Sequence, residues 1–83
     1  MYTIKYTFYI ASAKMCLESR ERKNLTFEDL KDTFNYLCYD NCSGKIVGTA
    51  TEGGKIVYSN GDECAFRIYY NGRFCKKYSH GVK

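Results

Sequence analysis

Residues 2–10 carry the pattern that most constrains the fold, an alternation of apolar and more polar side chains. One face of an extended segment would hold Tyr2, Ile4, Tyr6, Phe8 and Ile10, and the other Thr3, Lys5, Thr7 and Tyr9. A repeat of two residues is typical of a half-buried β-strand, so we expect a strand that packs one face on a core. A chain of 83 residues has room for one such core, and residues 1–83 are expected to form a single domain.

Residues 13–22 fit either a helix or an edge strand. Ser12 could cap a helix in which Cys16 and Leu17 share one face with Ala13, and the segment is rich in helix formers. Met15 and Leu17 also alternate as they would in a strand. The sequence leaves both structures open for this segment.

The segment after Leu25 has the signals of a helix start. Thr26 and Asp29 have the spacing of a capping box, and Leu25 with Leu30 has the spacing of a hydrophobic staple. One helical face would then carry an apolar stripe of Phe27, Leu30, Phe34, Leu37 and Cys38. We therefore expect a helix that packs this stripe on a sheet and ends near Asp40.

From residue 45 onwards the sequence predicts strands and tight turns, with strands at 45–51, 55–59, 63–70 and 73–78. Gly53-Gly54 predicts a two-residue turn that sets Glu52 opposite Lys55, and 60–62 predicts a second turn. Asn71-Gly72 is a strong hairpin signal, because both residues tolerate positive φ. The expected fold class is α+β: an antiparallel sheet of four to five strands packed on one main helix, in the order β-α(α)-β-β-β-β.

The hairpin around Asn71-Gly72 contains the candidate binding surface. A two-residue turn would place Tyr69 opposite Phe74, and Arg67 opposite Lys76. Two like charges in that position cost up to about 1 kcal/mol, which an anionic partner would offset. The alternative is that the cations extend into water and the rings only stabilise the hairpin. The expected partner-binding residues are Arg67, Tyr69, Arg73, Phe74, Lys76, Lys77 and Tyr78.

The distribution of charge also favours an anionic partner. The formal net charge is +4, yet residues 1–66 hold eight basic and nine acidic side chains, whereas residues 67–83 hold five basic side chains and no acid. A one-signed chain end favours an anionic partner, whether nucleic acid, an acidic protein surface or an anionic membrane, and the alternative is a solvated basic tail.

No pattern in the sequence indicates catalysis, a metal or a cofactor. Five cysteines cannot all pair within the chain, which argues for free thiols in a reducing cytoplasm, and Cys38-x3-Cys42 lacks a second close pair for zinc. His80 lies close to the last residue, and neither a phosphate loop nor a complete calcium loop is present. The Asp62-Glu63 pair has the composition of a solvated turn, and no apolar run is long enough to span a membrane. We expect a protein that is not an enzyme.

The function expected from these patterns is that of a small inhibitor or adaptor which binds a larger protein or nucleoprotein through the basic aromatic sheet face. Many phage or mobile-element counter-defence proteins, the anti-CRISPR inhibitors among them, are small domains of this style. The alternative is direct binding of RNA or single-stranded DNA, because RNA-binding modules stack bases on sheet rings beside cations.

Overall fold

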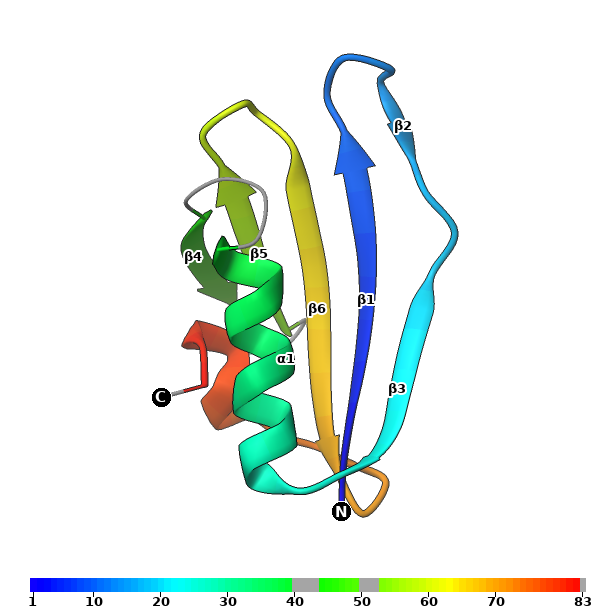
Figure 1. Cartoon of the computed structure of the whole chain (residues 1–83), viewed down its shortest axis with the longest axis vertical. Coiled ribbons are helices and arrows are strands. Elements are labelled where there is room, and N and C mark those ends of the chain that lie inside the picture. Colours follow the sequence, from blue (N-terminus) through cyan, green and yellow to red (C-terminus); the bar gives the residue numbers. More distant parts are fainter. Residues whose placement is uncertain (40–43, 50–52, 83) are drawn as a thin grey trace.

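The computed structural model of the chain describes residues 1–39, 44–49 and 53–82. Figure 1 shows a single sheet with one long helix lying across part of it. The elements in chain order are β1 (Tyr2–Ile10), β2 (Met15–Cys16), β3 (Arg20–Leu25), α1 (Phe27–Tyr39), β4 (Gly44–Thr49), β5 (Gly53–Tyr58), β6 (Glu63–Tyr70), β7 (Arg73–Phe74) and the 3₁₀-helix η1 (Lys76–His80).

The sheet is antiparallel at every pairing, and the predicted α+β class is confirmed. β1 pairs with β6 on one side and with β2 and β3 on the other. β5 follows β6, and β4 forms the edge beyond β5. The short β7 pairs with β6 near the Asn71-Gly72 turn. The alternating segment 2–10 therefore lies in the middle of the sheet as a strand, as its pattern predicts.

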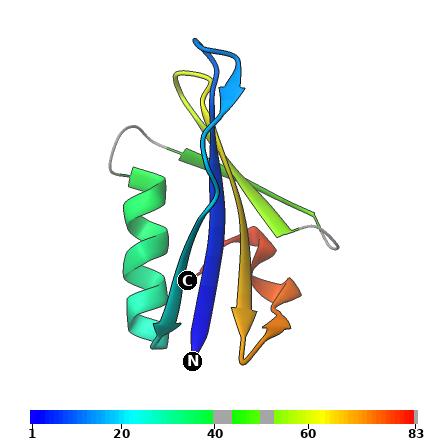
Figure 2. The same cartoon turned by 90° about the vertical axis from the view of Figure 1, so that its right-hand side faces the viewer.

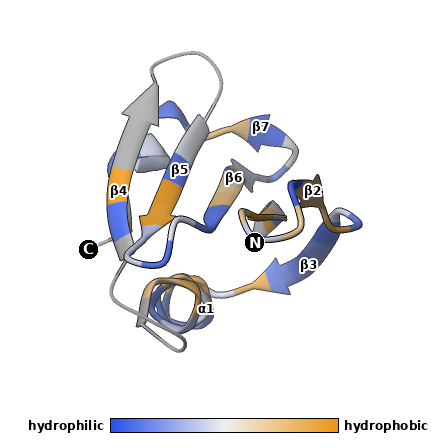
Figure 3. Ribbon diagram, turned by 90° about the horizontal axis from the view of Figure 1, so that it is seen from above, coloured by the Kyte–Doolittle hydropathy of each residue, from blue (hydrophilic) through white to orange (hydrophobic). Residues whose placement is uncertain are grey.

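The segment 13–22 does not form a helix. Residues 11–14 turn the chain, Met15 pairs with Ile10, and β3 then runs back along β1. A helix here would bury few apolar side chains, whereas a strand satisfies the free edge of β1. Charged side chains fill most of β3, which is hydrophilic along nearly its whole length (Figure 3), and charge at a sheet edge discourages pairing with another chain.

The start of α1 matches its sequence signals. The backbone N–H of Asp29 donates to Thr26 Oγ1 over 3.1 Å, and the N–H of Thr26 donates to Asp29 Oδ2 over 3.3 Å. Leu25 and Leu30 are both buried on either side of this capping box. The predicted capping box is therefore confirmed, both leucines of the predicted staple are buried in the core, and the box fixes where the chain leaves the sheet edge to form the helix.

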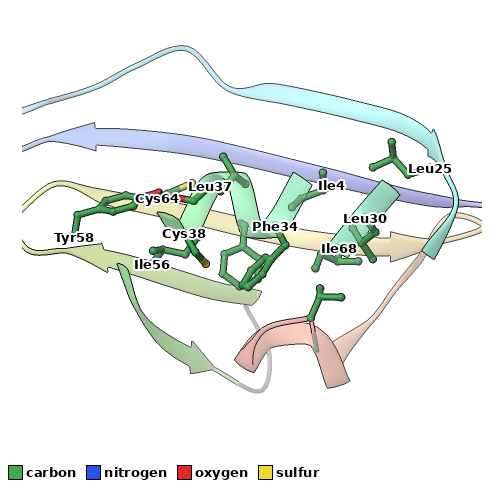
Figure 4. Close-up of a cluster of buried hydrophobic side chains, with 12 residues drawn as sticks. Ile4, Leu25, Leu30, Phe34, Leu37, Cys38, Ile56, Tyr58, Cys64 and Ile68 are labelled. Carbon is green, nitrogen blue, oxygen red and sulfur yellow. Dashed lines mark hydrogen bonds between the residues drawn. The ribbon is translucent and has the colours of Figure 1, made fainter. Parts of the chain in front are cut away.

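The core lies between α1, η1 and one face of the sheet (Figure 4). The rings of Phe34 from α1 and Phe66 from β6 meet edge to face, with their centroids 5.2 Å apart. Fully or almost fully buried side chains surround them: Ile4, Leu30, Cys38, Ile56, Cys64 and Ile68. Figure 2, which views the molecule from the β3 edge, shows α1 lying along one side of β1 only. The apolar stripe predicted for residues 27–38 thus faces the sheet.

The two hairpins predicted from glycines have different outcomes. Asn71 and Gly72 have φ of 48° and 83°, and Tyr69 lies opposite Phe74 as predicted. At Gly53-Gly54 the prediction is wrong: Gly53 lies opposite Thr49 within the ladder, and Lys55 lies between Val47 and Ala65. The expected Glu52 partner lies outside the described residues. Residue 54 must be glycine because the Phe66 ring and the Ser79 carbonyl oxygen leave no room for a Cβ atom, and not because the chain turns there.

The last predicted strand is shorter than expected. It ends at Phe74, and the chain continues as η1 from Lys76. The expected pairing of Arg67 with Lys76 is therefore wrong, and Arg67 lies directly opposite Lys5 of β1. The physical reason is burial: η1 brings Ser79 and the following Val82 into the core, which an extended strand would leave in water.

The turn at residues 60–62 is confirmed. The Tyr58 N–H donates to the Asp62 carbonyl over 2.9 Å, and the Asp62 N–H donates to Asn60 Oδ1 over 3.0 Å. In the described part of the chain, α1 and η1 are both too short and too polar to span a membrane.

Candidate functional site

The sheet has one face that no described helix covers. Alternation along the strands sends Ile4, Ile56, Phe66 and Ile68 to the core, and their neighbours to the opposite side. We call this side the outer face. By register it includes Thr3, Lys5, Thr7, Tyr9, Cys16, Glu21, Lys45, Lys55, Val57, Glu63, Ala65, Arg67, Tyr69 and Phe74, and Lys23 lies beside Glu21.

Two cations face each other at the centre of the outer face. Lys5 of β1 and Arg67 of β6 are directly opposite in the ladder, and both are exposed. Like charges in this position are destabilising. Lys5 Nζ lies 5.1 Å from the ring centroid of Tyr69, and that ring meets Phe74 with centroids 5.9 Å apart. The arrangement is a cationic centre bordered by rings.

The charge of the outer face is strongly positive. Its described residues include five cations and two carboxylates, a net charge of +3. Both carboxylates lie near lysines: Glu63 is 3.0 Å from Lys55 Nζ, and Glu21 is 3.6 Å from Lys23 Nζ. Glu63 therefore offsets Lys55, whereas Glu21 lies both near Lys23 and directly opposite Lys5 in the ladder, and the net charge of the face remains positive.

A surface hollow of about 430 Å³ lies over this cationic centre. Ala65 is exposed and has the smallest side chain in this part of β6, so the longer side chains stand around it. The lining side chains include Lys5, Thr7, Ser19, Arg67 and Tyr69. An acidic group placed in the hollow would approach two cations and several hydroxyls at once.

Only part of the predicted site is gathered on this face. Arg67, Tyr69 and Phe74 lie there, whereas Arg73 pairs with Tyr70 and so belongs to the opposite side of the sheet. Tyr78 contacts the rings of Tyr2 and Phe27 beside the core. Lys76 and Lys77 belong to η1, which packs on the core side of the sheet. The basic chain end predicted from composition is therefore not one patch.

Lys5, Lys55, Thr7 and Ala65 complete the surface and were not expected from the sequence. The polar side of the alternating segment 2–10 was visible, and Lys5 is on it. Its position beside Arg67 depends on the pairing of β1 with β6, two strands far apart in the chain.

Other reactive groups have structural roles or lie apart. Asp62 Oδ1 accepts the Ala11 N–H over 2.9 Å, so this carboxylate joins two loops. His80 is exposed on η1. Among the described residues no three His, Cys, Asp or Glu side chains are close enough to hold a metal ion, and Cys42 of the weighed zinc set lies outside them.

The described cysteines differ sharply in accessibility. Cys16 is exposed on the edge strand β2, whereas burial raises the pKa of Cys38, and raises that of Cys64 to about 12. We expect iodoacetamide at pH 8 to alkylate Cys16 in the folded protein and to leave Cys64 unmodified until urea is added. Site-resolved mass spectrometry of the alkylated protein measures this.

The same burial gives a pH dependence. The Cys64 thiol ionises in the unfolded chain near its ordinary value of 9.0, but in the folded chain only near pH 12. The folded state holds the proton more tightly, so this stabilisation is complete below pH 9 and is lost as the pH rises toward 12. Cys64→Ala should remove that part of the alkaline loss; equal losses in both proteins would contradict the assignment.

Comparisons of the chain with protein-family models, with curated proteins and with solved structures gave no match. The function must therefore be argued from the outer face itself.

Proposed function

We propose that the chain is a non-enzymatic binding module, an inhibitor or adaptor that places its outer face on an acidic surface of a larger protein or nucleoprotein. The observation that carries the proposal is the pair Lys5 and Arg67, opposed on neighbouring strands of an uncovered sheet face. An inhibitor of the phage counter-defence type, such as an anti-CRISPR protein, is one member of this class.

The energetics of the pair favour a bound anion. A carboxylate or phosphate between Lys5 and Arg67 would approach two positive charges at once and lower the electrostatic free energy of both. Such surfaces mainly raise the association rate and select the partner. The rings of Tyr69 and Phe74 add the aromatic area that interface anchors use.

The size of the outer face suits this role. A standard interface takes about 800 Å² from each partner. That is roughly one seventh of the accessible surface of 5517 Å², and a sheet face of several strands can supply it. The free thiols of the described cysteines fit a reducing cytoplasm as the compartment of action.

Direct binding of RNA or single-stranded DNA is the second candidate. The observation in its favour is an accessible ring, Tyr69, between cations on a sheet face. One side of that ring already carries Lys5, and its edge contacts Phe74, so fewer ring surfaces are open to bases than in a stacking platform. The protein partner is therefore preferred.

The test is a pull-down from a bacterial lysate with the tagged protein, with and without nuclease and at two salt concentrations. A stoichiometric protein retained after nuclease treatment supports the proposal. Retention of mixed nucleic acid, lost on nuclease treatment and falling steeply with salt, would replace it with the second candidate.

A further inference from the structure

A second hollow, of about 290 Å³, lies on the helix side of the sheet, beyond the C-terminal end of α1. Figure 1 shows β1, β2 and the β5–β6 turn extending past the end of this helix. We call it the helix-end hollow. Its lining residues come from β1, the 17–20 segment, α1 and the β5–β6 turn: Tyr6, Phe8, Ile10, Leu17, Arg20, Tyr36, Leu37, Tyr58, Asn60 and Asp62.

We propose that the helix-end hollow binds one aromatic side chain of an acidic peptide segment from a partner. The hollow lies on the face opposite the outer face, so this inference goes beyond the proposed function. A chain with two such faces could contact two surfaces at once, which is the geometry that an adaptor needs.

The walls of the hollow are largely aromatic. Phe8 and Tyr58 stack with their centroids 6.4 Å apart, and Tyr6 meets Phe8 edge to face at 5.8 Å. The Tyr58 hydroxyl donates to the Leu37 carbonyl, which holds the Tyr58 ring against α1. A ring entering the hollow would therefore meet rings that are already positioned.

Several large hydrophobic side chains at the rim of the hollow are exposed to solvent. Leu17 is 41% exposed and Tyr36 61%, and both line the hollow. Met15, 53% exposed, lies opposite Ile10 in the ladder and so on the same side. These are three of the five exposed large hydrophobic side chains in the described part of the chain. Their grouping at one place indicates an interaction surface.

The volume of the helix-end hollow indicates the size of ligand that it can hold. Pockets for small molecules usually enclose about 300–1,000 Å³, so 290 Å³ is at the lower limit for a cofactor or metabolite. It suits one large side chain presented by a peptide, and aromatic side chains are the usual anchors of protein interfaces.

The polar groups at the rim select an acidic neighbour for that side chain. The Arg20 guanidinium has no hydrogen bond or ion pair with any other described residue. Asp62 also lines the hollow and keeps its charge, but both of its oxygens already accept hydrogen bonds: Oδ1 from the Ala11 N–H, and Oδ2 from Asn60 Nδ2. Arg20 is therefore the charged group of the hollow whose hydrogen-bond donors are unused by the described residues, and a carboxylate is the acceptor that its guanidinium binds best.

The experiment uses amide chemical shifts of the ¹⁵N-labelled protein, titrated with acetyl-Asp-Trp-Asp-amide and acetyl-Lys-Trp-Lys-amide. We expect the acidic peptide to shift the amides of Tyr6, Phe8, Leu17 and Tyr36, and to bind about threefold tighter than the basic one. Arg20→Gln should remove that difference. Leu17→Ser with Tyr36→Ser should remove the shifts, whereas Tyr70→Ser, at an exposed ring outside the hollow, should preserve them.

Three outcomes would overturn the proposal. The first is an absence of shifts around the hollow with either peptide, and the second is equal affinity of the native protein for both peptides. The third is dimerisation without peptide, detected by sedimentation velocity and abolished by Leu17→Ser, which would show that a second copy covers the hollow. None of these bears on Lys5 or Arg67, so the outer face is tested separately.

Discussion

Replacing Lys5 and Arg67 together by Thr is expected to weaken capture of the partner by about 30-fold or more, because interface residues of this kind contribute about 2 kcal/mol or more. The free energy of unfolding should stay within about 0.5 kcal/mol of the parent, because both side chains are exposed on the sheet surface. Thr suits a strand and keeps the side chain branched at Cβ. Elution from a heparin column and the lysate pull-down measure binding, and urea unfolding measures stability.

The matched control is Lys76→Thr with Lys77→Thr. This variant removes the same amount of charge from η1, which packs on the core side of the sheet. The sequence predicts both lysines as partner-binding residues, but neither lies on the outer face. The control should elute from heparin later than the Lys5 and Arg67 variant and retain the partner. If the two double variants lose binding equally, net charge and not the outer face holds the partner. If the Lys5 and Arg67 variant unfolds, those side chains are structural.

The parts of the fold that the sequence predicts correctly depend on residues close together in the chain. The capping box of Thr26 and Asp29 spans a single turn of helix, and Asn71-Gly72 forms its turn by local φ values. The strand at 2–10 is recognisable because its alternation is complete within one segment. In each case the physical cause is contained in the pattern itself.

The errors arise where tertiary pairing decides the structure. Residues 13–22 fit both a helix and an edge strand by their local pattern, and the open edge of β1 decides for the strand. Gly54 resembles a turn residue until β6 and η1 are known to converge on it. The last strand ends early because η1 buries Ser79 and Val82.

The same division explains the candidate site. Arg67, Tyr69 and Phe74 could be placed on one face because β6 and β7 form a local hairpin. Lys5 reaches Arg67 only through the pairing of β1 with β6, and composition gives no sign of that pairing. A cation does lie opposite Arg67, as the sequence predicts, but it is Lys5 of β1 and not Lys76.

Gly54→Ala is expected to destabilise the fold by about 3 kcal/mol, a large part of the total of about 5–15 kcal/mol typical of a domain. A Cβ at residue 54 would lie 2.2 Å from Cζ of Phe66 and 2.4 Å from the Ser79 carbonyl oxygen. One of these atoms belongs to a core ring and the other to the backbone of η1, so neither can move cheaply. Urea unfolding followed by circular dichroism measures the effect.

Gly72→Ala provides a control in which space is not limiting. Nothing lies within 4 Å of a Cβ at residue 72, but φ is 83°, so only the backbone strain of a left-handed residue, about 1 kcal/mol, should appear. Adding Phe66→Leu should make the cost of Gly54→Ala smaller than in the parent, because the shorter side chain leaves room near residue 54. A Gly54→Ala protein with the parent's unfolding midpoint would mean that η1 does not pack on β5. The core would then be enclosed by α1 and the sheet alone.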